Sequence, residues 1–227
     1  TDDFSFIRAD DNEVLLKSLE ELVDGYLALG YRAQDIQVLT PQRTGAVGVE
    51  SLNHILRWRL NPENPIPVTE EEGGGARFQL GERVLQTKNN YQLEVFNGDL
   101  GTVIDIKNDG GLKVEMEDGR KVDYAKKDTS ALQYGYAITV HKSQGGERPI
   151  ILLVCSPSHT HMLNRNLIYT GITRGKQRVV MVGSPRTAVI AARKKDELVR
   201  ATGLVFEIAR VNGLARKAPP RPASRGP

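Results

Sequence analysis

The stretch that decides the fold is Y-G-Y-A-I-T-V-H-K-S-Q-G-G-E, residues 134–147. Its first half is apolar and predicts a strand that ends at Val140. Its second half is a run of hydrogen-bond donors, followed by two glycines that allow close approach of the backbone to a ligand, and an acid. A strand that ends in several donors is typical of proteins that hold a sugar–phosphate backbone without reading bases. The alternative is an ordinary polar strand end.

A second block, N-L-I-Y-T-G-I-T-R-G-K, occupies residues 166–176. Thr170 and Arg174 are four residues apart and share one face of a predicted helix, which we expect Gly175 to cap. An arginine at a helix end can reach a phosphate site of another domain, where its planar guanidinium stabilises charge on a transferring phosphoryl group. The alternative is a surface arginine that interacts favourably with the helix dipole.

The sequence has no phosphate-binding loop of the form G-x-x-x-x-G-K-[ST]. Lysine followed by serine or threonine occurs only at Lys17 and Lys142, and neither lysine follows a glycine. The apolar strand predicted at residues 150–154 ends in Cys155 and Ser156, which offer no acidic magnesium ligand. We therefore expect that this chain does not hydrolyse a nucleoside triphosphate alone.

Helical and strand patterns alternate at both ends of the chain, which predicts an α/β fold with a parallel sheet. In the first part, apolar residues at helical spacing follow Asp10 and Asp11, namely Leu15, Leu19, Leu22, Tyr26 and Leu29. A strand over residues 36–40, a polar loop at 42–45 and a helix over 48–60 come next, and an irregular connection follows at 61–76. In the second part, strands are predicted at 150–154 and 179–182, and helices at 163–174 and 187–201.

The middle of the chain has a different pattern. Between Phe78 and Tyr124, alternating apolar residues and the turn signals Asn108–Gly111 and Asp118–Gly119 predict short antiparallel strands. This is a small β unit within the larger α/β domain. We therefore predict an α/β domain at residues 1–75 and 131–211, a β insert at 76–130 and a disordered, basic, proline-rich tail at 212–227.

Composition limits the classes of function. The formal net charge is +3, but four positive charges lie in the tail after Asn212, so the rest of the chain carries −1 and any basic surface is local. No apolar run is long enough to span a membrane. The single cysteine, Cys155, fits a reducing, cytoplasmic compartment. We predict no metal site at Cys155, His159 and His161, which lack a fourth ligand and a zinc spacing. Because the chain begins with Thr1, we expect it to be part of a longer protein.

Four ordered segments resemble motifs of RecD-like helicases. Residues 38–48, with L-T-P-Q-R-T-G-A-V-G, resemble motif IV, and residues 83–101, with K-N-N-Y and V-F-N-G-D-L-G, resemble the segment leading into the family's β insert. Residues 136–147 resemble motif V, and residues 169–176 resemble motif VI. The likeness is to the carboxyl-terminal half of superfamily 1 helicases of the 5′-to-3′ class, the relatives of the D subunit of exodeoxyribonuclease V, which act in DNA repair and recombination.

The resemblance implies a second RecA-like motor domain, a parallel sheet with flanking helices, interrupted by a small SH3-like β-barrel. It also implies roles by position. Arg174 and Arg43 are the expected catalytic arginines, which together with Gly146 and Glu147 form the nucleotide-binding set. The expected contacts to single-stranded DNA are Thr139, His141, Lys142, Asn89 and Asn90. The cofactor is expected to be ATP with Mg²⁺, bound mainly by an amino-terminal motor domain of the same protein, and the tail is a candidate site for a protein partner. From this we expect Arg43 and Arg174 to meet at one edge of the sheet.

Three other functions are compatible with parts of the sequence. The motifs also fit the motor half of a conjugative relaxase, which a nicking domain upstream would reveal. An SH3-like barrel on an α/β scaffold also fits a protein-binding module without motor function. A passive single-strand binder is the third alternative, but it has no need of arginines that act on another domain's nucleotide.

Overall fold

The structure is a computed structural model that describes residues 3–61 and 78–194. The predicted irregular connection, the predicted start of the insert at residue 76 and the predicted tail at 212–227 lie outside these residues. The part of the predicted last helix beyond residue 194 also lies outside them.

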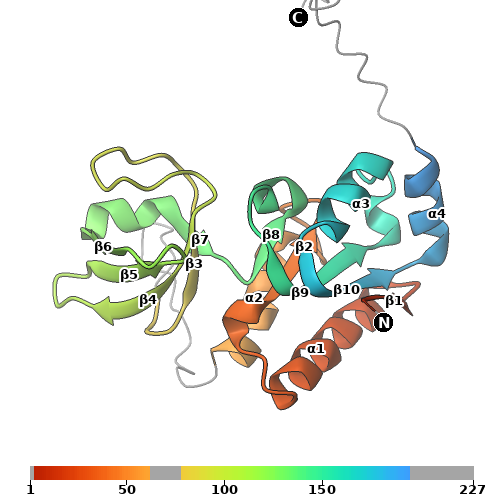
Figure 1. The fold of residues 1–227 in the computed structure, drawn as a ribbon, viewed down its shortest axis with the longest axis horizontal. Coiled ribbons are helices and arrows are strands. Elements are labelled where there is room, and N and C mark those ends of the chain that lie inside the picture. The colour runs from red at the N-terminus through yellow and green to blue at the C-terminus, as the bar shows by residue number, and fades with distance from the viewer. Residues whose placement is uncertain (1–2, 62–77, 195–227) are drawn as a thin grey trace, which may run out of the picture. The chain divides into compact units, whose positions relative to one another are not determined.

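The first and last parts of the chain form one parallel sheet of five strands (Figure 1). The strands lie in the order β1 (Phe4–Arg8), β10 (Gly175–Gly183), β9 (Arg148–Cys155), β2 (Ile36–Thr40) and β8 (Ala137–Thr139). Every neighbouring pair runs parallel. The predicted α/β sheet is therefore confirmed. The predicted strand ending at Val140 is shorter than expected, because Val140 already begins a 3₁₀ turn, η3 (Val140–Ser143).

Helices cover both faces of the sheet. Side chains along a strand point alternately to opposite faces, so each face has its own core. Ile150, Leu152 and Val154 of β9 belong to the core beneath α1 (Asn12–Ala28) and α2 (Val49–Leu60). Ile151 and Leu153 face the other core, which contains residues of α3 (Arg165–Ile172) and α4 (Pro185–Arg193). Figure 1 shows α1 on one side of the sheet and α3 and α4 on the other. A strand buried on both faces is apolar throughout, which is why β9 could be predicted from sequence.

Helix α1 differs in detail from its prediction. Asp11 is its N-cap, and the Asp11 carboxylate accepts a hydrogen bond from the Val14 N–H at 2.8 Å. Val23 is buried in the core, whereas Leu29 lies beyond the helix with 75% of its surface exposed. Helix α3 also ends earlier than expected: Thr173 is its C-cap, and Gly175 begins β10 rather than capping the helix.

The insert is a five-stranded antiparallel sheet with its own core, which confirms the predicted β unit. Its strands lie in the order β6 (Lys121–Tyr124), β5 (Leu112–Met116), β4 (Leu100–Ile106), β3 (Arg83–Gln86) and β7 (Leu132–Tyr134). A 3₁₀ turn, η2 (Lys126–Ala131), precedes β7. Because β7 pairs with β3, the antiparallel sheet extends to Tyr134, beyond the predicted end of the insert at residue 130.

Buried polar side chains fasten the insert to the parallel sheet. The Arg57 guanidinium of α2 donates to the Glu82 carboxylate at 2.6 Å, and the side chains of these residues are 7% and 0% exposed. Asn53 of α2 donates to the carbonyls of Tyr134 and Ala137, at 3.1 and 2.9 Å, where the chain leaves the insert. These bonds replace the hydration that the buried groups lose, so the insert and the sheet share one polar junction.

Two further 3₁₀ turns, η1 (Ala33–Asp35) and η4 (Pro157–His159), complete the described elements. Within the described ranges, none of the helices has the length and apolar character that a membrane span requires.

Candidate functional site

The segment from Val140 to Glu147 connects two opposite edges of the parallel sheet. It begins at the carboxyl end of β8, where Thr139 pairs with Thr40, the last residue of β2. It ends at the amino end of β9, where Arg148 pairs with Gly175, the first residue of β10. Gly145 has a φ of 88°, a backbone conformation that favours glycine. The segment therefore presents different residues to the two edges.

Positive charge gathers at the carboxyl edge. Arg43 lies in the loop after β2, exposed, and its guanidinium is 3.9 Å from the Glu50 carboxylate. Thr139 and Lys142 are half-buried and His141 is exposed, all at the carboxyl end of β8. Burial lowers the pKa of Lys142, and the positive charge of Arg43 lowers that pKa further. No hydrogen bond or ion pair to the Lys142 ammonium occurs among the described residues, so this edge holds a cation with no anionic partner.

The amino edge carries the other predicted residues. The Arg174 guanidinium donates to the carbonyls of Thr170 and Gly146, at 3.2 and 3.3 Å, and to the Thr173 hydroxyl at 3.1 Å. Glu147 is exposed and lies 3.8 Å from the ammonium of Lys176. Arg174, Gly146 and Glu147 are therefore neighbours, as a shared site requires.

The expectation that Arg43 and Arg174 meet at one edge is wrong. Arg43 follows the carboxyl end of β2, whereas Arg174 precedes the amino end of β10. Because the two strands run parallel, these positions are at opposite ends of the sheet. The five residues of β2 alone span about 17 Å. Arg43 instead lies near Lys142.

Asn89 and Asn90 hold the shape of their loop. The Asn89 side-chain carbonyl accepts from the Asn97 N–H at 2.9 Å. The Asn90 side-chain carbonyl accepts from the N–H groups of Gln92 and Leu93, at 3.1 and 3.2 Å. The side-chain carbonyls of both residues therefore serve the loop, and their expected contact with DNA, through the amide N–H groups, stays a prediction.

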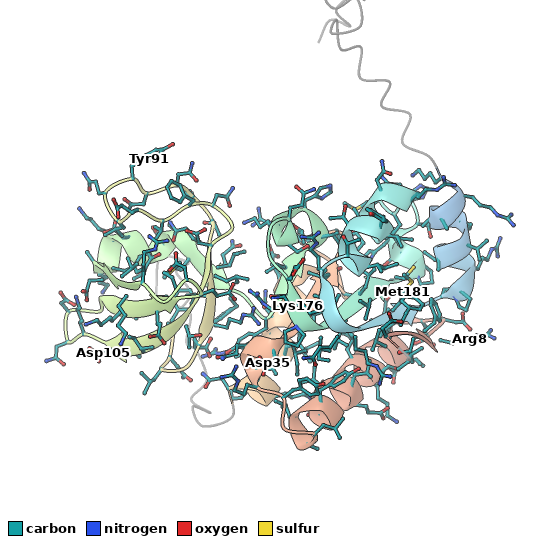
Figure 2. All side chains as sticks on the ribbon, in the orientation of Figure 1. Arg8, Asp35, Tyr91, Asp105, Lys176 and Met181 are labelled. Atoms are coloured by element: carbon teal, nitrogen blue, oxygen red, sulfur yellow. The ribbon has the colours of Figure 1, made fainter. Side chains whose placement is uncertain are left out.

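Two aromatic residues of the same loop are exposed. Tyr91 is 76% and Phe96 46% exposed, and their rings meet edge to face with centroids 6.1 Å apart. Figure 2 shows Tyr91 projecting from the loop into solvent. Large exposed aromatic side chains in a well-bonded loop form a surface on which flat groups can stack.

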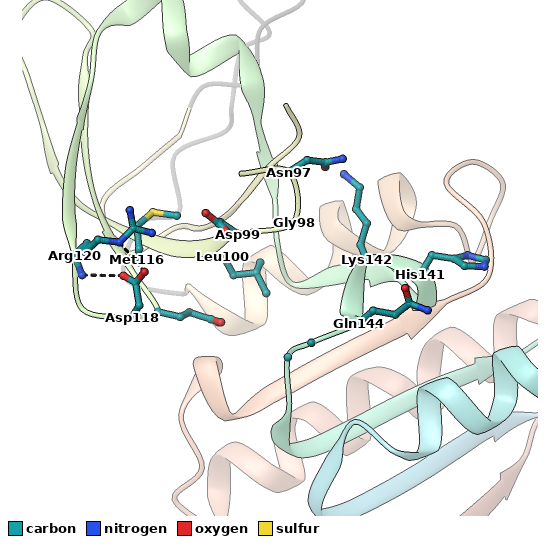
Figure 3. A pocket seen from close by; sticks show the side chains of 13 residues that line it. Asn97, Gly98, Asp99, Leu100, Met116, Asp118, Arg120, His141, Lys142 and Gln144 are labelled. Atoms are coloured by element: carbon teal, nitrogen blue, oxygen red, sulfur yellow. Dashed lines mark hydrogen bonds and ion pairs between the residues drawn. The ribbon is translucent and has the colours of Figure 1, made fainter. Parts of the chain in front are cut away.

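A cleft of about 520 Å³ lies between the insert and the turn that follows β8. Asn97, Asp99 and Arg120 line it from the insert, and Lys142 and Gln144 line it from the turn. In Figure 3 the Lys142 and Asn97 side chains point toward each other, whereas His141 points away. The acids of this cleft are already partnered: Asp99 accepts from the Phe96 N–H, and Asp118 is paired with Arg120. Lys142 therefore lies in the cleft without an anionic partner among the described residues.

Three residues that sequence reasoning missed join the insert to the amino edge. The Glu117 carboxylate is paired with Arg83, at 3.2 Å, and with Arg148. Arg83 is buried within strand β3, and burial lowers its pKa to about 10, with a further lowering by the charge of Arg148. In the sequence, only the position of a charged residue inside an apolar strand could have indicated that Arg83 has a role. Nothing in the sequence indicates that its partner is Glu117.

The described ranges contain no group of three or more histidine, cysteine or acidic residues that is placed to hold a metal ion. Cys155 and His159 are both buried. Burial raises the pKa of the Cys155 thiol to about 12 and lowers the pKa of the His159 imidazole to about 4. These two residues are therefore neutral at physiological pH.

Two family profiles match the chain. The SH3 domain of ATP-dependent RecD-like DNA helicases matches residues 52–116, and the UvrD-like helicase C-terminal domain matches residues 134–182. The first match covers the insert as far as β5, and the second covers the segments that carry His141, Lys142, Glu147 and Arg174. The first match thus agrees with the β insert seen in the structure, and the second with the α/β part that follows it.

Curated relatives agree. The ATP-dependent RecD2 DNA helicase of Deinococcus radiodurans is 40% identical over 174 residues, which is 76% of this chain and 23% of the relative. The RecBCD enzyme subunit RecD of Mycolicibacterium smegmatis is 31% identical over 169 residues, 74% of this chain and 28% of the relative. The chain thus spans about a quarter of the length of these relatives.

Among solved structures, the Pif1 helicase from Candida albicans aligns with a TM-score of 0.48 at 14% identity, covering 87% of this chain and 58% of that one. A Bacteroides Pif1 structure bound to single-stranded DNA aligns with a TM-score of 0.46 at 18% identity, covering 78% and 45%. The family assignment rests on the sequence relatives and the profiles. By its profiles and sequence relatives the chain is RecD-like, and its SH3-like insert interrupts an α/β domain with a parallel sheet.

Proposed function

We propose that this chain is the second motor domain of an ATP-dependent 5′-to-3′ DNA helicase or translocase. It works with an amino-terminal motor domain of the same protein, supplies an arginine to the ATP bound there, and grips single-stranded DNA. The family supports this proposal, because the relatives are named as DNA helicases or as RecD subunits of the RecBCD enzyme.

The observation that carries the proposal is the state of Arg174. All three hydrogen bonds of its guanidinium go to uncharged oxygens. Among the described residues, no carboxylate lies within ion-pair distance of it. A half-buried guanidinium with fixed geometry and no counter-charge is suited to meet an anion from a neighbouring domain.

The residues present fit a nucleotide that is held mainly elsewhere. The cavity beside Arg174 measures about 70 Å³, well below the size of a complete small-molecule site. Arg174 can stabilise negative charge on a terminal phosphate, and Glu147 can accept a hydrogen bond from a ribose hydroxyl beside the exposed backbone of Gly146. ATP with Mg²⁺ supplies the free energy of phosphoanhydride cleavage, and we assign the metal and most phosphate contacts to the amino-terminal domain.

The opposite edge suits the DNA strand. Lys142 and Arg43 are two nearby cations, and a backbone phosphate would neutralise both. Thr139 and His141 lie beside them and can donate to phosphate or sugar oxygens. We therefore move Arg43 from the nucleotide-binding set to the strand-binding set, because it lies with Lys142 and not with Arg174. In the insert, we propose Tyr91 and Phe96 as stacking groups in the same loop as Asn89 and Asn90.

One continuous segment links the two edges. Gly146, whose carbonyl accepts from Arg174, is four residues from Lys142 in the turn between β8 and β9. A shift of Arg174 toward an anion would pull on this segment and so act on the strand-binding end. Alternating attraction and release at Arg174 can thus alternate the grip on the strand, which directed movement requires.

The test uses the protein that carries both motor domains. We expect Arg174→Ala to lower DNA-stimulated ATP hydrolysis by on the order of 10³-fold. The Kd for a single-stranded oligonucleotide should stay within about twofold, since the Arg174 guanidinium bonds to Thr170, Thr173 and Gly146 and to none of the proposed strand-binding side chains. Arg193→Ala is the matched control, because Arg193 is an exposed arginine at the end of another helix, α4. An equal loss of hydrolysis and of strand binding in Arg174→Ala would show that the residue does not act on the nucleotide.

A further inference from the structure

Glu117 joins two parts of the fold that are far apart in sequence. It follows β5 in the turn toward β6 of the insert. Its Oε1 accepts from Nη2 of Arg83 at 3.2 Å and also from Nη2 of Arg148. The side chains of Arg83 and Arg148 are 5% and 15% exposed, whereas Glu117 is 41% exposed. One partly exposed carboxylate thus neutralises two guanidiniums that water hardly reaches.

Arg83 fastens this cluster to the start of β2. Its Nη1 donates to the carbonyl of Ile36 at 2.9 Å and to that of Ala33 at 3.3 Å. Arg83 itself belongs to β3 of the insert, and its backbone N–H donates to the Tyr136 hydroxyl at 3.3 Å. These bonds fix one guanidinium of the cluster at the junction of insert and sheet.

Arg148 connects the cluster to the nucleotide-facing edge. Its backbone N–H donates to the Arg174 carbonyl at 2.9 Å, and its Nη1 donates to the Glu147 carbonyl at 2.8 Å. The Nε of Arg148 is buried and has no hydrogen-bond partner in the described part of the chain. Direct bonds therefore run from Arg174 through Arg148 to Glu117.

The contacts of Arg148 would allow a second arrangement of the cluster besides the one seen here. Arg148 can hold Glu117, as it does here, or it can turn toward an anion that reaches the neighbouring Arg174. In the second state Glu117 loses one of its two partners, and the turn that carries it is held less firmly. That turn also lines the cleft into which Lys142 projects (Figure 3). An anion at the amino edge would thus change the insert-side wall of the strand-binding cleft.

We propose that Glu117 is a positioning residue that couples the nucleotide-facing edge to the insert, so that strand affinity depends on the state of the nucleotide site. The coupling element is the ion-pair cluster of Glu117 with Arg83 and Arg148. This inference rests on the proposed function, since it takes Arg174 to face a nucleotide and Lys142 to face the strand.

The experiment measures a coupling factor in the protein with both motor domains. The Kd for a fluorescent oligo-dT is determined with and without a non-hydrolysable ATP analogue and magnesium, and the factor is the ratio of the two values. For the unmodified protein we expect a ratio between about 5 and 150 in either direction. In Glu117→Gln we expect the ratio to fall to within about twofold of unity, and the effect is read from this ratio and not from the Kd in either state alone.

Two further variants separate coupling from simple stability. Glu115→Gln makes the same chemical change two residues away, where Glu115 pairs only at 3.7 Å with Lys121, and it should keep the full ratio. Glu117→Gln leaves two buried guanidiniums without a counter-charge and will lower the melting temperature. The double variant Glu117→Gln with Arg148→Gln removes that repulsion, so it should regain stability but not coupling.

The outcomes are distinct. An unchanged ratio in folded Glu117→Gln, or a double variant that regains the ratio together with its stability, overturns the proposal. An equal loss of affinity for the oligonucleotide with and without nucleotide also overturns the proposal, because such a loss indicates a structural role only. If the unmodified protein binds DNA without any response to nucleotide, the proposed function fails first, and the Glu117 proposal fails with it.

Discussion

Lys142 and Arg43, on segments nearly a hundred residues apart in sequence, bring their positive charges together beyond the carboxyl ends of β8 and β2. Burial lowers the pKa of Lys142, and the charge of Arg43 adds to this lowering. Lys142 has no anionic partner among the described residues, and Arg43 has the exposed Glu50 carboxylate at 3.9 Å, so a ligand that supplies negative charge would stabilise both cations. This pair is therefore the strongest indication of where a phosphate binds.

The pKa of Lys142 predicts a pH dependence of strand binding. A bound phosphate favours the charged ammonium and raises this pKa, so binding takes up a proton in the interval between the lowered free value and the raised bound value. We expect affinity for oligo-dT to fall as pH rises through that interval, starting below the ordinary lysine pKa of 10.5. Fluorescence anisotropy over a pH series that runs from neutral up to the ordinary lysine pKa measures it.

Lys142→Arg is the matched variant for this prediction. It keeps the positive charge but does not titrate below about pH 12, so its affinity should be flat over the same range. If the unmodified protein and Lys142→Arg show the same pH profile, Lys142 does not meet the phosphate.

Arg43 is predicted to act on the strand and not on the nucleotide. Removing one phosphate contact to single-stranded DNA should lower the slope of log K against log salt by about 0.7. We expect Arg43→Ala to show this change while the turnover of ATP at saturating DNA stays within about twofold. Arg174→Ala should show the opposite pattern, with a loss of ATP turnover and an unchanged salt slope. A turnover defect in Arg43→Ala at saturating DNA would return Arg43 to the nucleotide-binding set.

The loop of the insert predicts a stacking contribution. Replacing Tyr91 or Phe96 by alanine should weaken single-strand binding by about 1–3 kcal/mol for each base that loses its partner. Tyr91→Phe keeps the ring and should bind like the unmodified protein. Unchanged affinity in both alanine variants would leave the exposed pair of rings for a protein contact, which binding of an amino-terminal domain supplied separately would reveal.

The buried pair of Arg57 and Glu82 predicts a strong double-mutant effect on stability. Arg57 Nη2 and Glu82 Oε2 are buried without partners in the described part of the chain, so the pair is incompletely satisfied. Arg57→Met alone should cost about 3–5 kcal/mol in the free energy of unfolding, because it leaves a buried carboxylate unpaired, whereas Arg57→Met with Glu82→Leu should cost little. Urea unfolding measures both, and additive losses would contradict the prediction.

The same pair predicts the direction of a pH effect. Burial raises the pKa of Glu82 above its ordinary value of 4.5, although the bonds to Arg57 and Asn61 oppose this. The folded protein therefore binds this proton more tightly than the unfolded chain. The contribution of Glu82 to stability is greatest below pH 4.5 and declines as pH rises through the raised value. Comparison with Glu82→Gln isolates this contribution.

Much of the fold could be predicted from local pattern. Strand β9 is apolar at every position from Ile150 to Cys155, as a strand buried on both faces must be. The insert was visible because Leu112, Val114 and Met116 alternate with charged residues between two hairpin turns. Strand β1 was missed, since it is a short edge strand whose residues are only partly buried.

The site could be predicted only as a set of residue types. The donors after β8 and the arginine after α3 were visible in sequence, because polar residues that directly follow apolar elements lie at the edge of a core. Their grouping was not visible, and Arg43 was assigned to the wrong edge. Whether Asn89 and Asn90 face a ligand or their own loop also depends on which backbone N–H groups the fold brings near them.

By itself, then, the order of apolar and polar residues determined the strands, the helices and the existence of the insert, because these depend on neighbours along the chain. Only the tertiary structure decided that Arg43 joins Lys142, that Arg174 faces the other edge, and that Glu117 lies between two guanidiniums. The reason is that electrostatic partners are chosen by distance in space, and the register of a parallel sheet sets those distances between residues far apart in sequence.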